Sequence, residues 1–279
     1  MAQWTRETPW RQGHLLDPDT IKSLNLTHPT APDDTVVVVA THDCDLAQLP
    51  EGEPLIEVIV GRAIATQGDG NCTHAKNARK LHIEFEGGAS LWVEVEATAK
   101  ATIAKTALAP FEPQTNAQLS PENKAIFQMW LASRYRRSAF PDEFERRLTK
   151  ETKLAEKIAK TVKPHGNLIT GVFFDVDDGQ EVTREGPEDT YKLDIIILHT
   201  ADPDFAAAEA AAKDIVAVIK KAFKDKLFNA NKKWQHIELH SCEAISESVL
   251  SYQLFKQLKR WRLEHISLAA DPQQPVLAE

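Results

Sequence analysis

The sequence contains little of several residue types, and each shortage excludes a class of protein. Three cysteines in 279 residues are too few, and uneven in number, for a disulfide framework. No run approaches the roughly 18 apolar residues that a membrane-spanning helix needs. The first residues lead into no apolar signal region. These shortages predict a cytoplasmic protein that makes no membrane contact.

The residues that are present describe a globular chain with an uneven charge. Hydrophobic residues make up 42% and charged residues 27%, which is enough to build a core, and the length predicts two domains. The formal net charge of -8 argues against a general affinity for nucleic acid. Residues 120–163, however, carry 11 basic and 6 acidic residues between two acidic flanks. Contact with a polyanion is therefore expected to involve this central segment.

The hydrophobic pattern predicts an α+β fold in three parts. Residues 1–119 form a mostly-β domain, a partly closed barrel or sheet, behind an N-terminal arm that Trp4 and Trp10 hold to the body. Residues 120–163 form a basic helical connector, and residues 164–279 form an α+β sandwich. The expected strands are residues 36–39, 55–60, 81–85, 91–95, 168–176, 191–199 and 237–239. A long helix capped by Asp204 and a final helix over residues 246–266 complete the prediction.

Four polar side chains, His42, Asp43, Cys44 and Asp45, follow the apolar run Val36–Val39 with no glycine or proline between. A buried strand would hold them rigidly at its end, where functional sites are often built. The alternative is a strand that simply runs into a polar loop.

Asp43, Asp45 and Glu57 are candidate ligands for a divalent cation, because clustered carboxylates suit magnesium. In that arrangement His42 or His74 would act as the acid or base, and Arg79 would stabilise developing negative charge. The alternative is a solvated acidic rim. The lysine that nuclease-type sites place after a strand glutamate is missing beyond Glu57.

Zinc and a catalytic thiol are two further alternatives. Histidine and cysteine alternate in the pairs His42/Cys44, Cys72/His74 and His240/Cys242, and both side chains are ligands that zinc prefers. A single intervening residue is tighter than the usual zinc spacing, although a strand would place both side chains on one face. Cys44 could instead act as a nucleophile if a nearby cation lowered its pKa.

The predicted β-domain contains one conspicuous loop, from Gln67 to Arg79, which is long and polar. Such a loop is ordered only by specific partners, so we expect it to fold back over positions 42–45, with Lys76 and Arg79 facing the carboxylates. The central segment adds Arg134, Arg136 and Arg137, with Arg146 and Arg147 beyond, as a surface for nucleic acid. The alternative is an ordinary solvated helix face.

A resemblance rests on several of these motifs. The strand that ends in Thr-His-Asp-Cys-Asp-Leu, the loop around His74 and Arg79, and the segment Trp130–Arg137 followed by Phe-Pro-Asp resemble a family of uncharacterised bacterial proteins associated with mobile genetic islands and phage defence. The resemblance covers roughly residues 35–150. It implies a biological setting and the residues to examine, and it implies no mechanism.

Two functions are compatible with the sequence. The first is a metal-dependent hydrolase or nuclease-like enzyme that acts on a phosphate-containing substrate, with Lys76 and the arginines of the central segment on nucleic acid. The second is a non-catalytic adaptor or immunity module that binds a protein partner or a nucleotide, with the C-terminal domain free to form a homodimer or to dock a partner.

Overall fold

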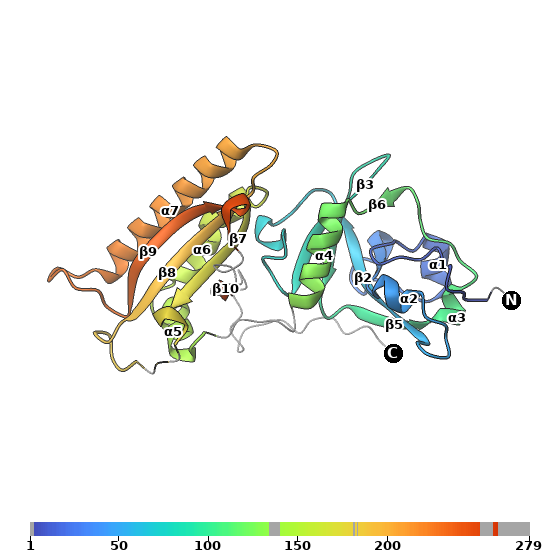
Figure 1. Cartoon of the computed structure of the whole chain (residues 1–279), viewed down its shortest axis with the longest axis horizontal. Helices are drawn as coiled ribbons and strands as arrows, with labels where there is room; N and C mark the ends of the chain where they lie inside the picture. Colours follow the sequence, from blue (N-terminus) through green and yellow to red (C-terminus); the bar gives the residue numbers. More distant parts are fainter. Residues whose placement is uncertain (1–2, 134–139, 181, 183, 252–258, 262–279) are drawn as a thin grey trace. The chain divides into compact units, whose positions relative to one another are not determined.

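The computed structural model describes residues 3–133, 140–180, 182, 184–251 and 259–261, which form two compact units (Figure 1). The first unit contains the described residues up to 133 except the segment Asp69–Lys76. That segment belongs to the second unit, together with the described residues from 140 onwards. The fold is mixed α+β with a curled, half-barrel sheet, as the sequence predicts.

The first unit is built on an antiparallel sheet with the strand order β1-β2-β4-β3-β6 and with β5 also paired to β2. Its strands are β1 (Thr35–Val39), β2 (Leu55–Ile64), β3 (Lys80–Gly87), β4 (Leu91–Glu96), β5 (Lys100–Ala104) and β6 (Ala117–Gln118). One half of β2 pairs with β5 and the other half with β4. Gly61 lies between the two halves, where a Cβ atom would come within 2.5 Å of the Glu94 carbonyl oxygen. A glycine is therefore needed where the sheet curls.

Both N-terminal tryptophans are buried, as predicted. The Trp4 indole N–H donates to the Leu46 carbonyl at 2.9 Å, and the Trp10 indole N–H donates to the Phe111 carbonyl at 3.2 Å. The first unit also contains the helices α1 (Pro18–Ser23), α2 (Asp43–Leu46), α3 (Lys105–Leu108) and α4 (Pro121–Ser133). Asp17 caps α1 by accepting two backbone N–H groups, which satisfies donors that a helix start leaves open.

The second unit has a four-stranded sheet in the order β10-β7-β8-β9. The strands are β7 (Ile169–Val176), β8 (Tyr191–His199), β9 (Ile237–Ser246) and β10 (Lys259–Trp261). β8 and β9 are parallel and are joined by helix α7 (Phe205–Leu227), which lies along the sheet (Figure 1). Asp204 caps α7, and an apolar stripe that includes Ile215, Ile219 and Phe223 is buried. Burial of each such side chain contributes about 1.5–3 kcal/mol.

The helical segment before β7 is interrupted. Helix α5 (Asp142–Arg146) runs into a π-helical turn (Arg147–Glu151), and helix α6 (Leu154–Val162) follows, with Lys153 as its N-cap residue at a positive φ of 57°. The sequence predicts a helical connector over residues 120–163; in its second half the π-helical turn and Lys153 interrupt the helix, which corrects that prediction. Insertions of the π type are rare and are often found at functional sites.

The predicted final helix is also wrong where the structure describes it. Lys259–Trp261 forms strand β10, which pairs with β7, and residues 252–258 and 262–266 lie outside the described residues. In the part of the chain that the structure describes, no helix is long and apolar enough to cross a membrane.

Candidate functional site

The residues predicted to lie at a strand end begin a short helix instead. β1 ends at Val39, and α2 (Asp43–Leu46) starts with His42 as its N-cap residue. The His42 Nδ1 atom accepts a hydrogen bond from the Cys44 N–H at 3.2 Å, as N-cap side chains do. The strand alternation that would place His42 and Cys44 on one face is therefore absent.

Asp43 is held by two partners within the first unit. Its Oδ1 atom accepts the Gln12 N–H at 2.7 Å, and its Oδ2 atom pairs with the Lys124 ammonium at 3.0 Å. Burial disfavours the charge on this carboxyl, but the two contacts outweigh that effect and lower the pKa of Asp43. Asp43 therefore connects α2 to the N-terminal arm and to α4.

Asp45 and Glu57 have separate surroundings. The Asp45 side chain is exposed. The backbone carbonyl of Asp45 accepts a hydrogen bond from the buried Lys105 ammonium at 2.6 Å. Glu57 lies on β2 and pairs with Lys100 at 3.0 Å. Within the described residues, no group of three or more His, Cys, Asp or Glu side chains is placed to hold a metal ion. The expected magnesium cluster of Asp43, Asp45 and Glu57 is therefore not assembled.

The expected zinc site of paired cysteines and histidines is not assembled either. Cys44 is exposed, Cys72 is buried in the second unit, and Cys242 is buried on β9. Burial raises the pKa of the Cys242 thiol to about 12, which keeps it protonated. These three cysteines and their neighbouring histidines form no metal-binding group in the described part of the chain.

The segment Asp69–Lys76 finds its partners in the second unit, rather than at positions 42–45 as expected. The Thr73 hydroxyl lies 3.0 Å from the Gly166 carbonyl oxygen, to which it donates. A Cβ atom on Gly70 would lie 2.3 Å from the Lys163 carbonyl oxygen, so the two backbones are in direct contact.

The buried side chain of Lys76 holds the segment Asp69–Lys76 to the second unit by hydrogen bonds. The side chain is 1% exposed, and its ammonium donates to the Thr73 hydroxyl at 3.0 Å and to the Gly166 and Ile169 carbonyl oxygens at 2.7 and 2.6 Å. Burial lowers the pKa of Lys76 well below its ordinary value. All three donors of the ammonium have acceptors, so Lys76 is not presented to a phosphate.

His74 and Arg79 belong to different units. Burial lowers the pKa of His74 to about 3, and the His74 carbonyl accepts a hydrogen bond from Arg260 at 2.8 Å within the second unit. Arg79 follows the segment in the first unit, where its N–H donates to the Asn77 side-chain oxygen at 2.8 Å. His74 is thus held by residues of the second unit, whereas Arg79, His42 and Asp43 belong to the first.

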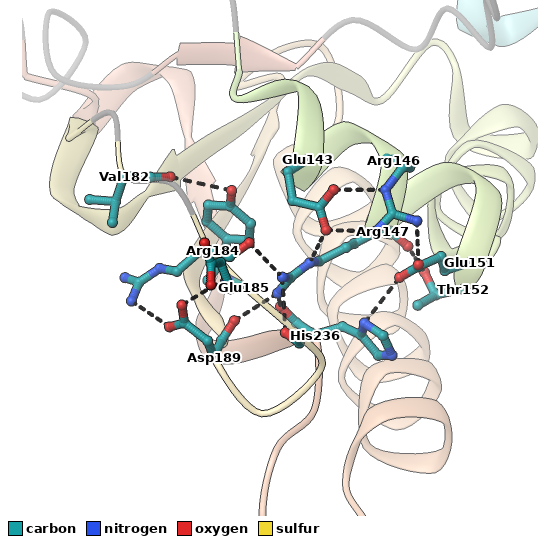
Figure 2. A network of polar contacts seen from close by, with 12 residues as sticks. Glu143, Arg146, Arg147, Glu151, Thr152, Val182, Arg184, Glu185, Asp189 and His236 are labelled. Atoms are coloured by element: carbon teal, nitrogen blue, oxygen red, sulfur yellow. Dashed lines mark hydrogen bonds and ion pairs between the residues drawn. The ribbon is translucent and has the colours of Figure 1, made fainter.

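Of the arginines predicted to bind nucleic acid, three lie outside the described residues and two take part in contacts within the second unit. Arg134, Arg136 and Arg137 lie outside the described residues. Arg147 is 1% exposed, and Figure 2 shows it at the centre of a polar network. Its guanidinium bonds to the Glu143 carboxylate and to the carbonyl oxygens of Arg184, Gly186, Asp189 and His236. Arg146 beside it pairs with Glu143 and Glu151.

A second charged cluster lies on the sheet of the first unit. Glu94 on β4 accepts from His82 at 2.8 Å and pairs with Arg62 at 2.8 Å and Lys80 at 3.2 Å. The His82 hydrogen bond, with help from Lys80 and Arg62, lowers the pKa of Glu94 to about 2. The other His82 ring nitrogen lies 2.7 Å from the Gln67 carbonyl oxygen, so the cluster also secures the chain just before the segment Asp69–Lys76.

A concave site lies wholly within the second unit, between α6 with its preceding turn and the segment Asp69–Lys76. We call it the lysine cavity; its volume is about 530 Å³. It is lined by Asp69, Asn71, Thr149, Lys150, Lys153, Ala155, Glu156, Ala159, Lys160 and Lys163. The volume lies within the range of small-molecule sites.

The charges of the lysine cavity are only partly balanced. Lys163 pairs with Asp69 at 2.8 Å, a contact that raises the pKa of Lys163, and Lys160 pairs with Glu156. Among the described residues, no carboxylate forms an ion pair with Lys150 or Lys153. The cavity therefore carries two cations in excess.

Sequence reasoning did not single out these lysines, although the basic excess of residues 120–163 was a signal for them. The basic excess directed attention to the arginines instead. Nothing in the sequence reveals that Asp69 and Asn71 would form a cavity together with α6. Comparisons with models of known protein families, with curated proteins and with solved structures found no match to this chain.

Proposed function

We propose that the chain is a non-catalytic binding module that holds a phosphate-containing ligand in the lysine cavity. The observation that carries the proposal is the pair of cations, Lys150 and Lys153, at a cavity whose two carboxylates are already paired. A phosphate group supplies the negative charge that this arrangement lacks.

The position of the two lysines on the fold supports an anion. Lys153 is the N-cap residue of α6, and Lys150 lies in the π-helical turn just before it. The N-terminal end of α6 carries a partial positive charge, which adds to that of Lys153. Lysine at an N-cap supplies no side-chain oxygen to the helix, so its ammonium remains available to a ligand.

The non-catalytic reading is supported by what surrounds the residues expected to perform chemistry. Asp43 and Glu57 are paired with lysines, and Lys76 donates to three oxygens of its own unit. A hydrolase that uses a metal needs several ligands around one point, and the described carboxylates do not converge in this way.

In this proposal the chain is a cytoplasmic adaptor or immunity module, and a partner protein recognises it when its cavity holds the ligand. The resemblance to bacterial proteins of mobile islands and phage defence favours that setting, which remains a prediction.

The test is calorimetric titration of the full chain with inorganic pyrophosphate. Loss of one charged hydrogen bond weakens binding by roughly 1.5–3 kcal/mol, so we expect Lys150→Gln and Lys153→Gln each to lower the affinity by about tenfold or more. Lys157→Gln is the matched control, because Lys157 is exposed on α6 but does not line the cavity. Absence of saturable binding, or equal affinities for the three variants, would overturn the proposal.

A further inference from the structure

We infer that the ligand of the lysine cavity is a nucleoside phosphate, with its phosphate at Lys150 and Lys153 and its base near Asn71. This inference rests on the proposed function and names the ligand class for the same site. It follows from the size of the cavity, from the position of Asn71 relative to the two unpaired lysines, and from the Asn71 side-chain oxygen, which has no hydrogen-bond donor among the described residues.

The cavity is much larger than a phosphate group. A volume of about 530 Å³ leaves most of the space unfilled when an inorganic anion occupies the cationic end. Ala155 and Ala159 border the remaining space from α6, with 1% and 3% of their surface exposed. The aliphatic stems of the lysines that line the cavity offer contact to an uncharged, flat body such as a base.

The distances along α6 suit a nucleotide. Lys153 precedes Ala159 by six positions, which is about 9 Å along the helix at 1.5 Å per residue. A phosphate, a ribose and a base together span such a distance, whereas phosphate or pyrophosphate alone does not. The Asn71 side chain lies at the Ala159 end, since its amide nitrogen donates to the Ala159 carbonyl oxygen at 3.2 Å.

The Asn71 side-chain oxygen provides the second, independent observation. The donation to Ala159 fixes which end of the amide is nitrogen, and the oxygen is buried with no hydrogen-bond partner among the described residues. An unsatisfied buried acceptor costs about 1–3 kcal/mol, and native structures contain few of them. An N–H group of a base that reached this oxygen would supply the missing donor. Adenine, guanine, cytosine and uracil all carry such a group.

The test compares nucleoside 5′-monophosphates with ribose 5-phosphate in titrations of the full chain. We expect a nucleotide to bind at least about tenfold more tightly than ribose 5-phosphate, because the base adds one hydrogen bond and apolar contact. In Asn71→Ala the affinity for ribose 5-phosphate should be kept while most of the advantage of the base is lost. Ribose 5-phosphate thus reports, in the same variant, that the cavity is still folded.

The other outcomes separate this inference from the proposed function. Equal affinities for nucleotide, ribose 5-phosphate and pyrophosphate would overturn the nucleoside assignment and leave anion binding standing. A parallel loss of nucleotide and ribose 5-phosphate in Asn71→Ala would make Asn71 a structural residue and overturn its role in holding the base. No binding of any of these compounds would remove both proposals.

Competition with a 5′-phosphorylated oligonucleotide distinguishes two ligands that both carry a nucleoside phosphate: a free nucleotide and the 5′ end of a nucleic-acid strand. Displacement of the bound nucleotide assigns the site to the end of a strand, and failure to displace it assigns a free nucleotide. Either result is compatible with a nucleoside phosphate at the lysines.

Discussion

Replacement of Arg147 by methionine should destabilise the second unit severely, while the same change at Arg146 should not. Figure 2 shows why two adjacent arginines differ. Arg147 is 1% exposed, and each of its five N–H groups has an acceptor, four of which are backbone carbonyl oxygens. Arg146 is 50% exposed and contacts only carboxylates at the surface.

The magnitude follows from what methionine leaves behind. Methionine keeps the aliphatic volume but removes every donor, so the carbonyl oxygens of Asp189 and His236, among others, lose a charged partner. Hydrogen bonds to a charged group contribute about 1.5–3 kcal/mol each, but these bonds are not additive and water re-enters at the rim. Removal of one partner from a buried ionic network typically costs about 3–5 kcal/mol, and we expect that loss here. Arg147→Lys, with three donors on one atom, should fall between wild type and Arg147→Met.

Urea unfolding followed by circular dichroism measures the effect. The expected loss is a large fraction of the total stability of a domain, so the midpoint of the transition should move clearly to lower urea. The two methionine variants must differ, because the surface ion pairs of Arg146 contribute little. If Arg147→Met is no less stable than Arg146→Met but binds pyrophosphate more weakly, Arg147 is a ligand-binding residue and the structural reasoning is wrong.

Two further predictions concern the charged cluster of the first unit and the segment Asp69–Lys76. Because Glu94 has a pKa of about 2 in the folded chain and an ordinary value of 4.5, its contribution of at most about 3 kcal/mol is present above pH 4.5 and is lost as the pH falls towards 2. Urea unfolding at pH 6 and pH 3 should show a loss of about 2 kcal/mol of this contribution in wild type and not in Glu94→Gln. The same pH dependence in both would refute the reasoning. Gly70→Ala, whose Cβ atom would lie 2.3 Å from the Lys163 carbonyl oxygen, should increase amide hydrogen exchange in Asp69–Lys76 and leave β1 unaffected, whereas unchanged exchange would contradict the close backbone contact.

The parts of the fold that the sequence predicted correctly depend on local patterns. Val36–Val39 lies in strand β1 because β-branched residues favour extended backbone. Asp204 begins a long helix because its carboxylate accepts the Ala207 N–H and the apolar residues behind it recur at helical spacing. The two tryptophans of the N-terminal arm were likewise predicted to be buried, and both are.

The errors occur where distant residues decide the structure. Lys259–Trp261 followed a helical pattern of leucines, but pairing with β7 made it a strand. The turn His42–Asp45 was read as the end of a strand, although two acidic residues at the start of a helix were a local signal for α2. The attachment of Asp69–Lys76 to the second unit depends on Gly166 and Ile169, which lie some ninety residues away. No periodicity in the sequence reports such a contact.

The contacts of the cations also show why the sequence did not point to the lysine cavity. Lys76 and Arg147 are buried, and backbone carbonyl oxygens occupy most of their donors, so an external anion would have to break those bonds first. Lys163 is exposed but already has the carboxylate of Asp69. Lys150 and Lys153 have neither kind of partner among the described residues, and both line the lysine cavity. A count of positive charge along the sequence weighs all of these residues equally, whereas the affinity for an anion depends on which donors remain unused.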